Sequence, residues 1–454
     1  MSAPHPALAA LRGDVPGNAW PPLHSSRLGS LAALIRELDA TQWLSPEAIA
    51  EGQRRQLTLL ARHYVDRSPH FAARLKGGGL TADTLADNFA ALPLLERRTL
   101  QADPGTLEEG ALPAGHQPIQ FVQTSGSTGE PVKVAKTAVT QLFWAAMTIR
   151  YHLWHERDFT GRLAAARALM PDPGPSATWG SPFTAFFETG PALRIDNGVD
   201  IAAQAADLAA FRPDTLIVYP TNLAALLDRI EAGDLALPSL KRVRTIAETL
   251  PPEVRRRAEA SLGASVRDCY SSEEAGYLAI ECPEGGQYHV MAETLLIEVI
   301  DDAGRPCREG EVGRVVVTDL HNHATPIIRY AIGDHAEVGG RCRCGRGLPT
   351  LKRILGRTRN MILLPDGRSY WPLTANKRLR EFAPVIQYQY IQESLESVEA
   401  RLVVERPLTM EEEEALRGVI RLYLGHDFAI RFTYFDEQIP KGRNGKFEEF
   451  KRSF

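Results

Sequence analysis

One loop in the sequence has residue types that suit the binding of phosphate groups. It consists of Thr124, Ser125, Gly126, Ser127, Thr128 and Gly129. Glycine lets the backbone turn with positive φ and approach a ligand closely. Backbone N–H groups and hydroxyls in such a loop can wrap phosphate oxygens, and Lys133 adds a positive charge. It is not a Walker loop, because no Gly-Lys-Ser/Thr follows at the required spacing. The alternative is a flexible Gly/Ser linker.

A second group of residues could hold a metal ion. Cys282 and His289 are followed, some fifty residues later, by the pair Cys342 and Cys344. Thiolate and imidazole groups are the ligands that tetrahedral zinc prefers. Four protein ligands would leave no open position, so the sequence predicts a structural zinc site. The alternative is four unrelated residues, with the free cysteines buried as small hydrophobic groups.

The composition limits what kind of protein presents these residues. The chain has 454 residues, 44% hydrophobic and 24% charged, which predicts an ordinary globular protein of two or more domains. The formal net charge of −4 gives no sign of a nucleic-acid partner. No apolar stretch reaches the roughly 20 residues needed to cross a bilayer, and the N-terminus does not read as a secretory signal. We therefore expect a cytoplasmic protein with no membrane partner.

The pattern of apolar residues predicts the elements that must position these side chains. Helical spacing is found at residues 31–38 and 46–75, after an irregular lead-in. A strand at 119–123 and a helix at 137–151 flank the Gly/Ser/Thr loop. Helices and strands then alternate, and residues 294–335 show strand-turn-strand signals. The alternation favours a layered α/β architecture.

The sequence thus predicts an α/β protein of two domains. The large N-terminal domain, residues 1–356, would contain layered β-sheets and helices with a β-rich subdomain, the Gly/Ser/Thr loop and the zinc knuckle. The small C-terminal domain, residues 357–454, would be a mobile α+β lid.

The Gly/Ser/Thr loop resembles the phosphate loop of the adenylate-forming superfamily, which includes acyl-CoA synthetases, peptide-synthetase adenylation domains and luciferases. Four further segments agree in the right order. YSSEE at 270–274 resembles Tyr-Gly-x-Thr-Glu, and RYAIGD at 329–334 resembles Tyr-x-Thr-Gly-Asp. GRTRN at 356–360 resembles the Gly-Arg-x-Asp-Asp hinge, and PKGRNGK at 440–446 resembles the C-terminal lysine loop.

Within this superfamily the chain is most similar to the phenylacetate-CoA ligase branch. The similarity is carried by RRQLTLLARHYVDRSPHFAARL, LPLLERRTL, TPIIRYAIGD and RCRCGRGLPTLKRILGRT. It runs from about residue 54 to the end of the chain. Members of this branch that bear cysteines at the knuckle look like zinc binders.

The resemblance implies an enzyme that uses ATP to convert a carboxylic acid into an acyl-AMP, releases pyrophosphate and passes the acyl group to coenzyme A. The carboxylate and the triphosphate repel each other, so catalysis is mainly positioning and neutralisation of charge. Lys446 would reach the α-phosphate and the carboxylate, and Glu274 would be a ligand of Mg²⁺. These two are the expected catalytic residues.

Other residues would bind the nucleotide. Asp334 would accept hydrogen bonds from the ribose hydroxyls, Arg357 would contact phosphate or ribose, and Tyr270, beside Ser271, would offer an aromatic face to adenine. A short segment resembling the adenine-lining segment of relatives consists of Ala247, Glu248 and Thr249.

The hinge departs from the family pattern, with Arg359-Asn360 in place of Asp-Asp. Two alternatives therefore stay beside coenzyme A ligation. The first is an adenylating ligase of the same fold that transfers the acyl group to an amine or a carrier-protein thiol. The second is a catalytically silent nucleotide-binding protein. Relatives are often dimers, so a homodimer is a further expectation.

Aromatic residues in the expected acid pocket indicate an aryl or arylacetic acid. They are Phe143, Trp144, Phe183, Phe186, Phe187 and Tyr219. The alternative is that these side chains simply belong to the core.

Overall fold

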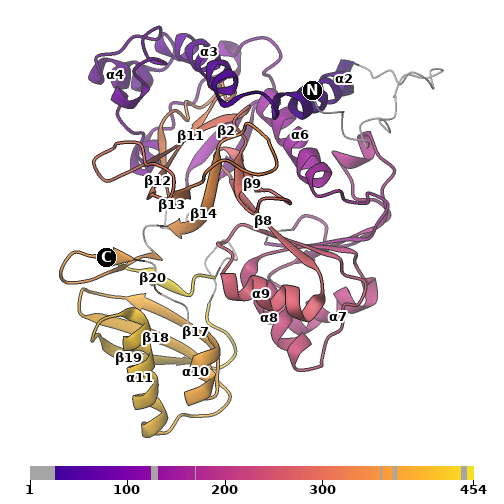
Figure 1. Cartoon of the computed structure of the whole chain (residues 1–454), viewed down its shortest axis with the longest axis vertical. Coiled ribbons are helices and arrows are strands. Elements are labelled where there is room, and N and C mark those ends of the chain that lie inside the picture. Colours follow the sequence, from indigo (N-terminus) through magenta and orange to yellow (C-terminus); the bar gives the residue numbers. More distant parts are fainter. Residues whose placement is uncertain are drawn as a thin grey trace. The chain divides into compact units, whose positions relative to one another are not determined.

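The computed structural model describes residues 26–123, 131–168, 170–357, 360–370, 372, 376–440 and 447–454 (Figure 1). The chain divides into two compact units, Met1–Ile354 and Leu355–Phe454. This division falls two residues before the boundary that the sequence predicts. Within the described residues no helix is both long and apolar enough to cross a bilayer.

Three helices begin the described part of the first unit: α2 (Ser26–Thr41), α3 (Pro46–Val65) and α4 (Pro69–Gly77). Both α3 and α4 start with a serine whose side chain accepts a backbone N–H, followed by proline at the first helical position. The predicted helical region is therefore three helices, and α4 ends in the glycine run. The first of them starts at Ser26, slightly earlier than the predicted lead-in allows.

Within the described residues, five α-helices and three short 3₁₀ helices complete the helical elements of this unit. They are α5 (Arg97–Ala102), α6 (Ala138–Trp154), α7 (Ile201–Phe211), α8 (Pro220–Glu231), α9 (Pro252–Leu262), η1 (Phe89–Ala91), η2 (Glu109–Ala111) and η3 (Phe183–Ala185).

A sheet of twelve strands forms the centre of the first unit, in the order β11-β12-β13-β14-β10-β9-β8-β7-β6-β3-β5-β4. The strands are β3 (Leu163–Arg167), β4 (Gly174–Ser176), β5 (Ala192–Asp196), β6 (Thr215–Val218), β7 (Arg242–Ile246), β8 (Ser265–Ser272), β9 (Gly276–Glu281), β10 (Tyr288–Val290), β11 (Leu295–Ile300), β12 (Val312–Asp319), β13 (Tyr330–Val338) and β14 (Thr350–Arg357). A separate hairpin pairs β1 (Gln120–Gln123) with β2 (Lys133–Lys136).

The β-rich part at residues 294–335 is not a separate sheet. Its strands β11, β12 and β13 pair in that order, β13 lies next to β14, and the short β10 pairs with both β14 and β9. The bridging strand leaves no unpaired edge between the antiparallel part and the parallel part. Sequence patterns could not reveal this, because β10 is only three residues long.

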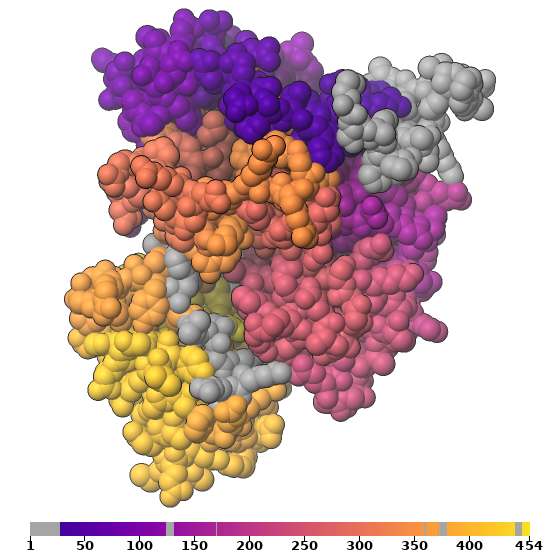
Figure 2. Space-filling model, in the orientation of Figure 1, coloured from indigo at the N-terminus to yellow at the C-terminus, as the bar shows by residue number. Residues whose placement is uncertain are grey.

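The parallel strands separate two hydrophobic cores. Side chains alternate between the faces of a strand, so on β7 Val243 belongs to the core with α7, α8 and α9, and Ile246 belongs to the core with α6. Helices α7, α8 and α9 lie together beside the strands (Figure 1). In the space-filling view this part of the chain forms one continuous pink surface (Figure 2).

The second unit is an α+β fold. Its four-stranded sheet has the order β19-β18-β17-β20, with β17 (Val385–Gln392), β18 (Ser397–Val404), β19 (Ala429–Phe435) and β20 (Phe450–Arg452). Helices α10 (Asn376–Phe382) and α11 (Met410–Leu424) and the hairpin β15 (Ile362–Leu363) with β16 (Ser369–Tyr370) complete it. Thr409 and Glu412 cap α11 reciprocally.

Candidate active site

Two of the predicted nucleotide residues meet in the first unit. Tyr270 lies near the end of β8 and Asp334 lies on β13, 64 residues further along the chain. The Tyr270 hydroxyl donates a hydrogen bond of 2.7 Å to Asp334 Oδ2. Strands β8 and β13 are not neighbours in the sheet, so the tertiary fold, and not strand pairing, joins these side chains.

Glu274 lies in the turn between β8 and β9, and it is 4% exposed. Its Oε1 accepts hydrogen bonds from Arg97 Nη1 at 3.3 Å and from the Tyr330 hydroxyl at 3.2 Å. Burial, reinforced by the Glu274 carboxylate, raises the pKa of Tyr330 above its usual range. The phenol therefore stays protonated and remains a donor to Glu274.

A buried lysine supports the same turn. Lys136, at the end of β2, donates to the main-chain oxygen of Glu274 and lies 3.7 Å from Asp319 Oδ2. Burial lowers the pKa of Lys136, and the two acidic residues oppose that change. The turn that carries Glu274 is thus held from its side chain and from its backbone.

Sequence reasoning assigned no role to Arg97, Tyr330 or Lys136. Arg97 and Tyr330 lie inside segments that resemble the phenylacetate-CoA ligase branch. The resemblance therefore includes both residues, but it does not indicate what either one does. Nothing in the sequence pattern marked Lys136, because only the fold places β2 beside the β8–β9 turn.

The segment from Ala247 to Thr249 directly follows β7. Ala247 has φ of +72°, a left-handed conformation that is uncommon outside glycine. The Glu248 carboxylate accepts hydrogen bonds from Thr221 N at 3.0 Å and from Thr221 Oγ1 at 3.2 Å. It therefore caps the positive end of α8. Strands β7 and β8 are parallel neighbours. This segment and the Tyr270-Ser271 pair therefore lie together at the carboxyl ends of the two strands.

The predicted phosphate loop connects β1 to β2. Its residues Thr124, Ser125, Gly126, Ser127, Thr128 and Gly129 lie outside the described residues, as does Lys446. Lys133 is described, and its Nζ lies 4.1 Å from the centre of the Phe121 ring. Arg357 is the last residue of β14 and belongs to the second unit.

Most of the aromatic residues predicted to line the acid pocket are buried among other core side chains. Phe183, Phe186 and Phe187 are at most 8% exposed and belong to the main core. Phe143 stacks on His321 with ring centres 4.0 Å apart, and Trp144 is 48% exposed. The core interpretation therefore fits the three phenylalanines of the 183–187 segment.

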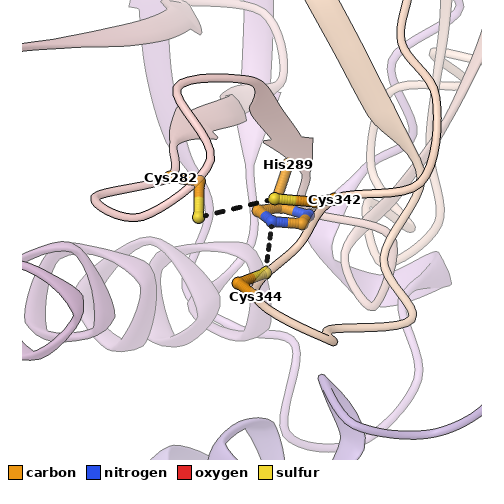
Figure 3. Close-up of side chains that lie close together, drawn as sticks. All are labelled: Cys282, His289, Cys342 and Cys344. Atoms are coloured by element: carbon orange, nitrogen blue, oxygen red, sulfur yellow. Dashed lines mark hydrogen bonds between the residues drawn. The ribbon is translucent and has the colours of Figure 1, made fainter.

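The structure brings together Cys282, His289, Cys342 and Cys344, whose ligand atoms all lie within 4.8 Å of one another. Figure 3 shows these side chains pointing toward one another from the end of β9, from β10 and from the loop before β14. His321 and His323 are not part of this group. The separation of 3.7 Å between the sulfurs of Cys282 and Cys342 is not that of a disulfide.

The surroundings of this cluster fit a metal ion. His289 Nδ1 lies 3.4 Å from the Leu348 carbonyl, and its Nε2 lies 3.1 Å from Cys344 Sγ. A proton on Nδ1 would leave the lone pair of Nε2 for a metal. At Gly285 any side chain is excluded, since a Cβ there would lie 2.2 Å from Cys342 Sγ. The Gly285 backbone N–H can instead donate to Cys282 Sγ, at 3.4 Å.

Comparisons with known proteins agree with this geometry. The family model described as AMP-binding enzyme matches residues 54–322, more than half of the chain. A second model, the CapK C-terminal domain, matches residues 376–453 in the second unit.

Several relatives are named phenylacetate-coenzyme A ligase. The chain is 25% identical to the Escherichia coli protein over 76% of its own length and 79% of that protein. It is also 25% identical to the Pseudomonas putida protein, over 72% and 74% of the two chains. The match to the Thermus thermophilus protein is 28% identical but spans only about half of that protein, 47%.

Solved structures share the fold. A 2-hydroxyisobutyryl-CoA ligase in complex with 2-HIB-AMP matches with a TM-score of 0.66 and 17% identity, over 88% of this chain and 89% of the other. An anthranilate CoA ligase in complex with anthranoyl-AMP matches with a TM-score of 0.53 and 16% identity, over 89% and 79%. The family model, the relatives and the shared fold lead to one conclusion: the chain belongs to the AMP-binding enzyme family.

Proposed function

We propose that this protein uses ATP to convert a carboxylic acid into an acyl-AMP, with release of pyrophosphate, and then transfers the acyl group to coenzyme A. The observation that carries the proposal is the meeting of Tyr270, Asp334 and the buried Glu274 turn with the segment after β7. Ligands of open α/β sheets bind outside the carboxyl ends of the strands, and this is where these residues lie.

Asp334 is the proposed ribose residue. A carboxylate accepts hydrogen bonds from two neighbouring hydroxyls, and the Tyr270 hydroxyl already fixes Oδ2 from one side. Asp334 would thus be oriented before the nucleotide arrives, and the Tyr270 ring would lie beside the base. Ser271, Ala247 and Thr249 would line the same edge.

Glu274 is the proposed magnesium residue. Arg97 and Tyr330 both bind its Oε1, so Oε2 would be the oxygen offered to the metal. Carboxylate oxygen is a ligand that Mg²⁺ prefers. When bound, magnesium would neutralise charge on the phosphates. Arg97, Tyr330 and Lys136 would keep the Glu274 turn in place while this happens.

The reacting groups would be held by residues on either side of this edge. A carboxylate oxygen attacks the α-phosphorus of ATP, the bond to the leaving phosphate breaks, and pyrophosphate departs. The loop at 124–129 and Lys133 would bind the phosphates. Lys446 would neutralise the charge shared by the α-phosphate and the attacking carboxylate, and Arg357 would contact phosphate or ribose.

The Cys/His cluster is proposed to hold a structural zinc ion. Three sulfurs and one ring nitrogen make a four-ligand set with no open position. The ion would join β9, β10 and the loop before β14, which the sheet connects only through the short β10. Its role would be to stabilise the fold rather than to take part in the reaction.

Coenzyme A is the proposed acceptor because the relatives that match over most of their length are named coenzyme A ligases. The proposed acid is an aryl or arylacetic acid for the same reason. A homodimer and a cytoplasmic location stay expectations.

Release of pyrophosphate tests the proposal. The purified protein, ATP and magnesium would be incubated with a panel of carboxylic acids, each with and without coenzyme A. We expect release that depends on an arylacetic or benzoic acid, and a thioester product only when coenzyme A is present. Release without any acid would contradict adenylation. Release with an acid that gives amides or carrier thioesters, but no coenzyme A thioester, would contradict only the acceptor.

A further inference from the structure

A cavity of about 350 Å³ lies at the end of the sheet opposite the Tyr270–Asp334 pair. We call it the basic pocket; it is bounded by the end of α6, the first residues of β7 and β8, and the turn after Cys282. The lining residues used below are Arg157, Arg242 and Arg267, with Glu156 and Glu284 also present.

Arg157 is a buried cation with no acidic partner among the residues that the structure describes. It is 5% exposed, and its Nη2 donates a hydrogen bond to the Tyr151 hydroxyl at 3.2 Å. Its Nε and Nη1 are buried with no partner among the described residues. Burial lowers the pKa of Arg157 only to about 10, so it stays charged at neutral pH. An uncompensated buried charge is costly.

A second buried arginine lies behind the first. Arg244 is 6% exposed, and its Nη2 donates to the Tyr277 hydroxyl at 2.9 Å and lies 3.5 Å from Cys269 Sγ. Its guanidinium lies 3.8 Å from the centre of the Tyr151 ring. Within the part of the chain that the structure describes, its Nε is buried without a partner.

Two further arginines donate hydrogen bonds to uncharged main-chain carbonyl groups. Arg242 Nη2 donates to Glu156 O at 3.2 Å, and Arg267 donates to Val266 O at 2.9 Å and to Pro283 O at 3.3 Å. Arg267 also directly faces Arg244 across the parallel β7–β8 pair. Like charges placed opposite each other destabilise a sheet.

Two of the acidic residues nearby pair with arginines outside the pocket, and two others, Glu156 and Asp158, are exposed. Glu281 lies 4.0 Å from Arg267, but it binds Arg255 through two hydrogen bonds of 2.8 and 3.0 Å. Glu284 pairs with Arg346 and is half exposed, and Glu156 points to solvent. The basic pocket therefore keeps an excess of positive charge.

We propose that the basic pocket binds a phosphate dianion, either free or at the end of a small metabolite. Guanidinium groups match the oxygens of phosphate in pairs, so an anion would accept hydrogen bonds from Arg242 and Arg267 and would compensate the buried charge of Arg157. The pocket is separate from the proposed nucleotide site at the carboxyl ends of β7 and β8. Arg242 begins β7 and Ala247 directly follows it, so the two lie roughly 17 Å apart at the rise of a strand. The proposal does not depend on the adenylation chemistry.

Titration calorimetry at low ionic strength tests the proposal. Inorganic phosphate and glycerol 3-phosphate would be titrated separately into the full chain, each with and without saturating AMP. We expect saturable binding of one anion per chain that AMP does not displace. Arg242→Gln and Arg267→Gln should each weaken it at least about tenfold, because each removes a charge-assisted hydrogen bond.

The matched control is Arg55→Gln, which removes the same charge from the exposed surface of α3 and should leave binding unchanged. Arg242 and Arg267 are only partly buried, and melting curves would show that their variants fold. Tighter binding of free phosphate or of the ester identifies which form the pocket takes. Loss of all binding in the presence of AMP, or parental affinity in both pocket variants, would overturn the proposal.

Discussion

The two ends of β7 and β8 present opposite kinds of charge. At their carboxyl ends lie acidic residues that already have donors: Asp334 is bound by Tyr270, and Glu274 by Arg97 and Tyr330. At their amino ends lie Arg242 and Arg267, which donate hydrogen bonds to main-chain carbonyls, near the buried Arg157, which donates to a tyrosine hydroxyl. One pair of strands thus supports an edge suited to a ribose and a metal ion, and a pocket suited to an anion.

The difference shows how a site can be recognised before its ligand is known. Asp334 and Glu274 are oriented by hydrogen bonds within the protein, which would pre-organise them for the proposed nucleotide. The basic pocket is not balanced internally, and buried charge without a partner is costly. At the acidic site the charged side chains have hydrogen-bond partners within the protein. In the basic pocket, nitrogens of Arg157 have no such partner among the described residues.

The largest expected effect concerns Lys446, the lysine of the proposed mechanism. Lys446→Ala should lower acid-dependent pyrophosphate release about a thousandfold, because it removes the charge that stabilises the transition state. Binding of ATP should stay measurable by calorimetry, and phosphate binding in the basic pocket should not change. Lys441→Ala, in the same segment, is the control. Full activity in the Lys446 variant would remove this lysine from the mechanism.

Replacing the proposed magnesium ligand should affect the site at the carboxyl ends of β7 and β8 but not the basic pocket at their amino ends. Glu274→Gln keeps the size of the side chain and removes its charge, so adenylation should fall roughly a hundredfold. Extra magnesium should restore part of the activity. The matched control is Glu273→Gln at the exposed neighbouring position. A variant with the parental magnesium dependence would show that Glu274 does not hold the metal.

Removal of the proposed zinc ion should affect stability more than chemistry. Chelation, or Cys344→Ser, should lower the melting temperature by about 10 °C, because a structural site contributes folding energy directly. Adenylation measured below the transition should be retained. Cys307→Ser, outside the cluster, serves as the control. Metal analysis showing under half an equivalent of zinc in carefully purified protein would contradict the assignment.

The smallest effect is expected from the hydrogen bond that orients the ribose residue. Tyr270→Phe keeps the aromatic face and removes the hydroxyl that binds Asp334. One hydrogen bond of this kind is worth about 1 kcal/mol, so KM for ATP should rise about fivefold with little change in kcat. An unchanged KM would mean that Asp334 is held by its other contacts.

Residue types and local patterns predicted much of this molecule. Helices α3 and α6 and the strand β1 follow from apolar spacing, and Cys282, His289, Cys342 and Cys344 were grouped from their chemistry alone. The fold class and the family followed from ordered motifs, which carry information along the chain.

Contacts between distant strands could not be predicted in the same way. The twelve-stranded sheet depends on β10, whose three residues show no clear pattern. Arg97, Lys136 and Tyr330 surround Glu274 only because three separate segments meet there. The basic pocket could not be predicted for the same reason, since its arginines come from a helix end and two strands.

The fate of the carboxylate oxygen tests the central claim most directly. The protein would convert an acid labelled with oxygen-18 in its carboxylate, in the presence of ATP and coenzyme A, and the AMP would be analysed by mass spectrometry. If the carboxylate attacks the α-phosphorus, one labelled oxygen must appear in AMP after the thioester forms. Thioester formation with unlabelled AMP would contradict an acyl-AMP intermediate and, with it, the assignment of the acidic edge of β7 and β8 to adenylation.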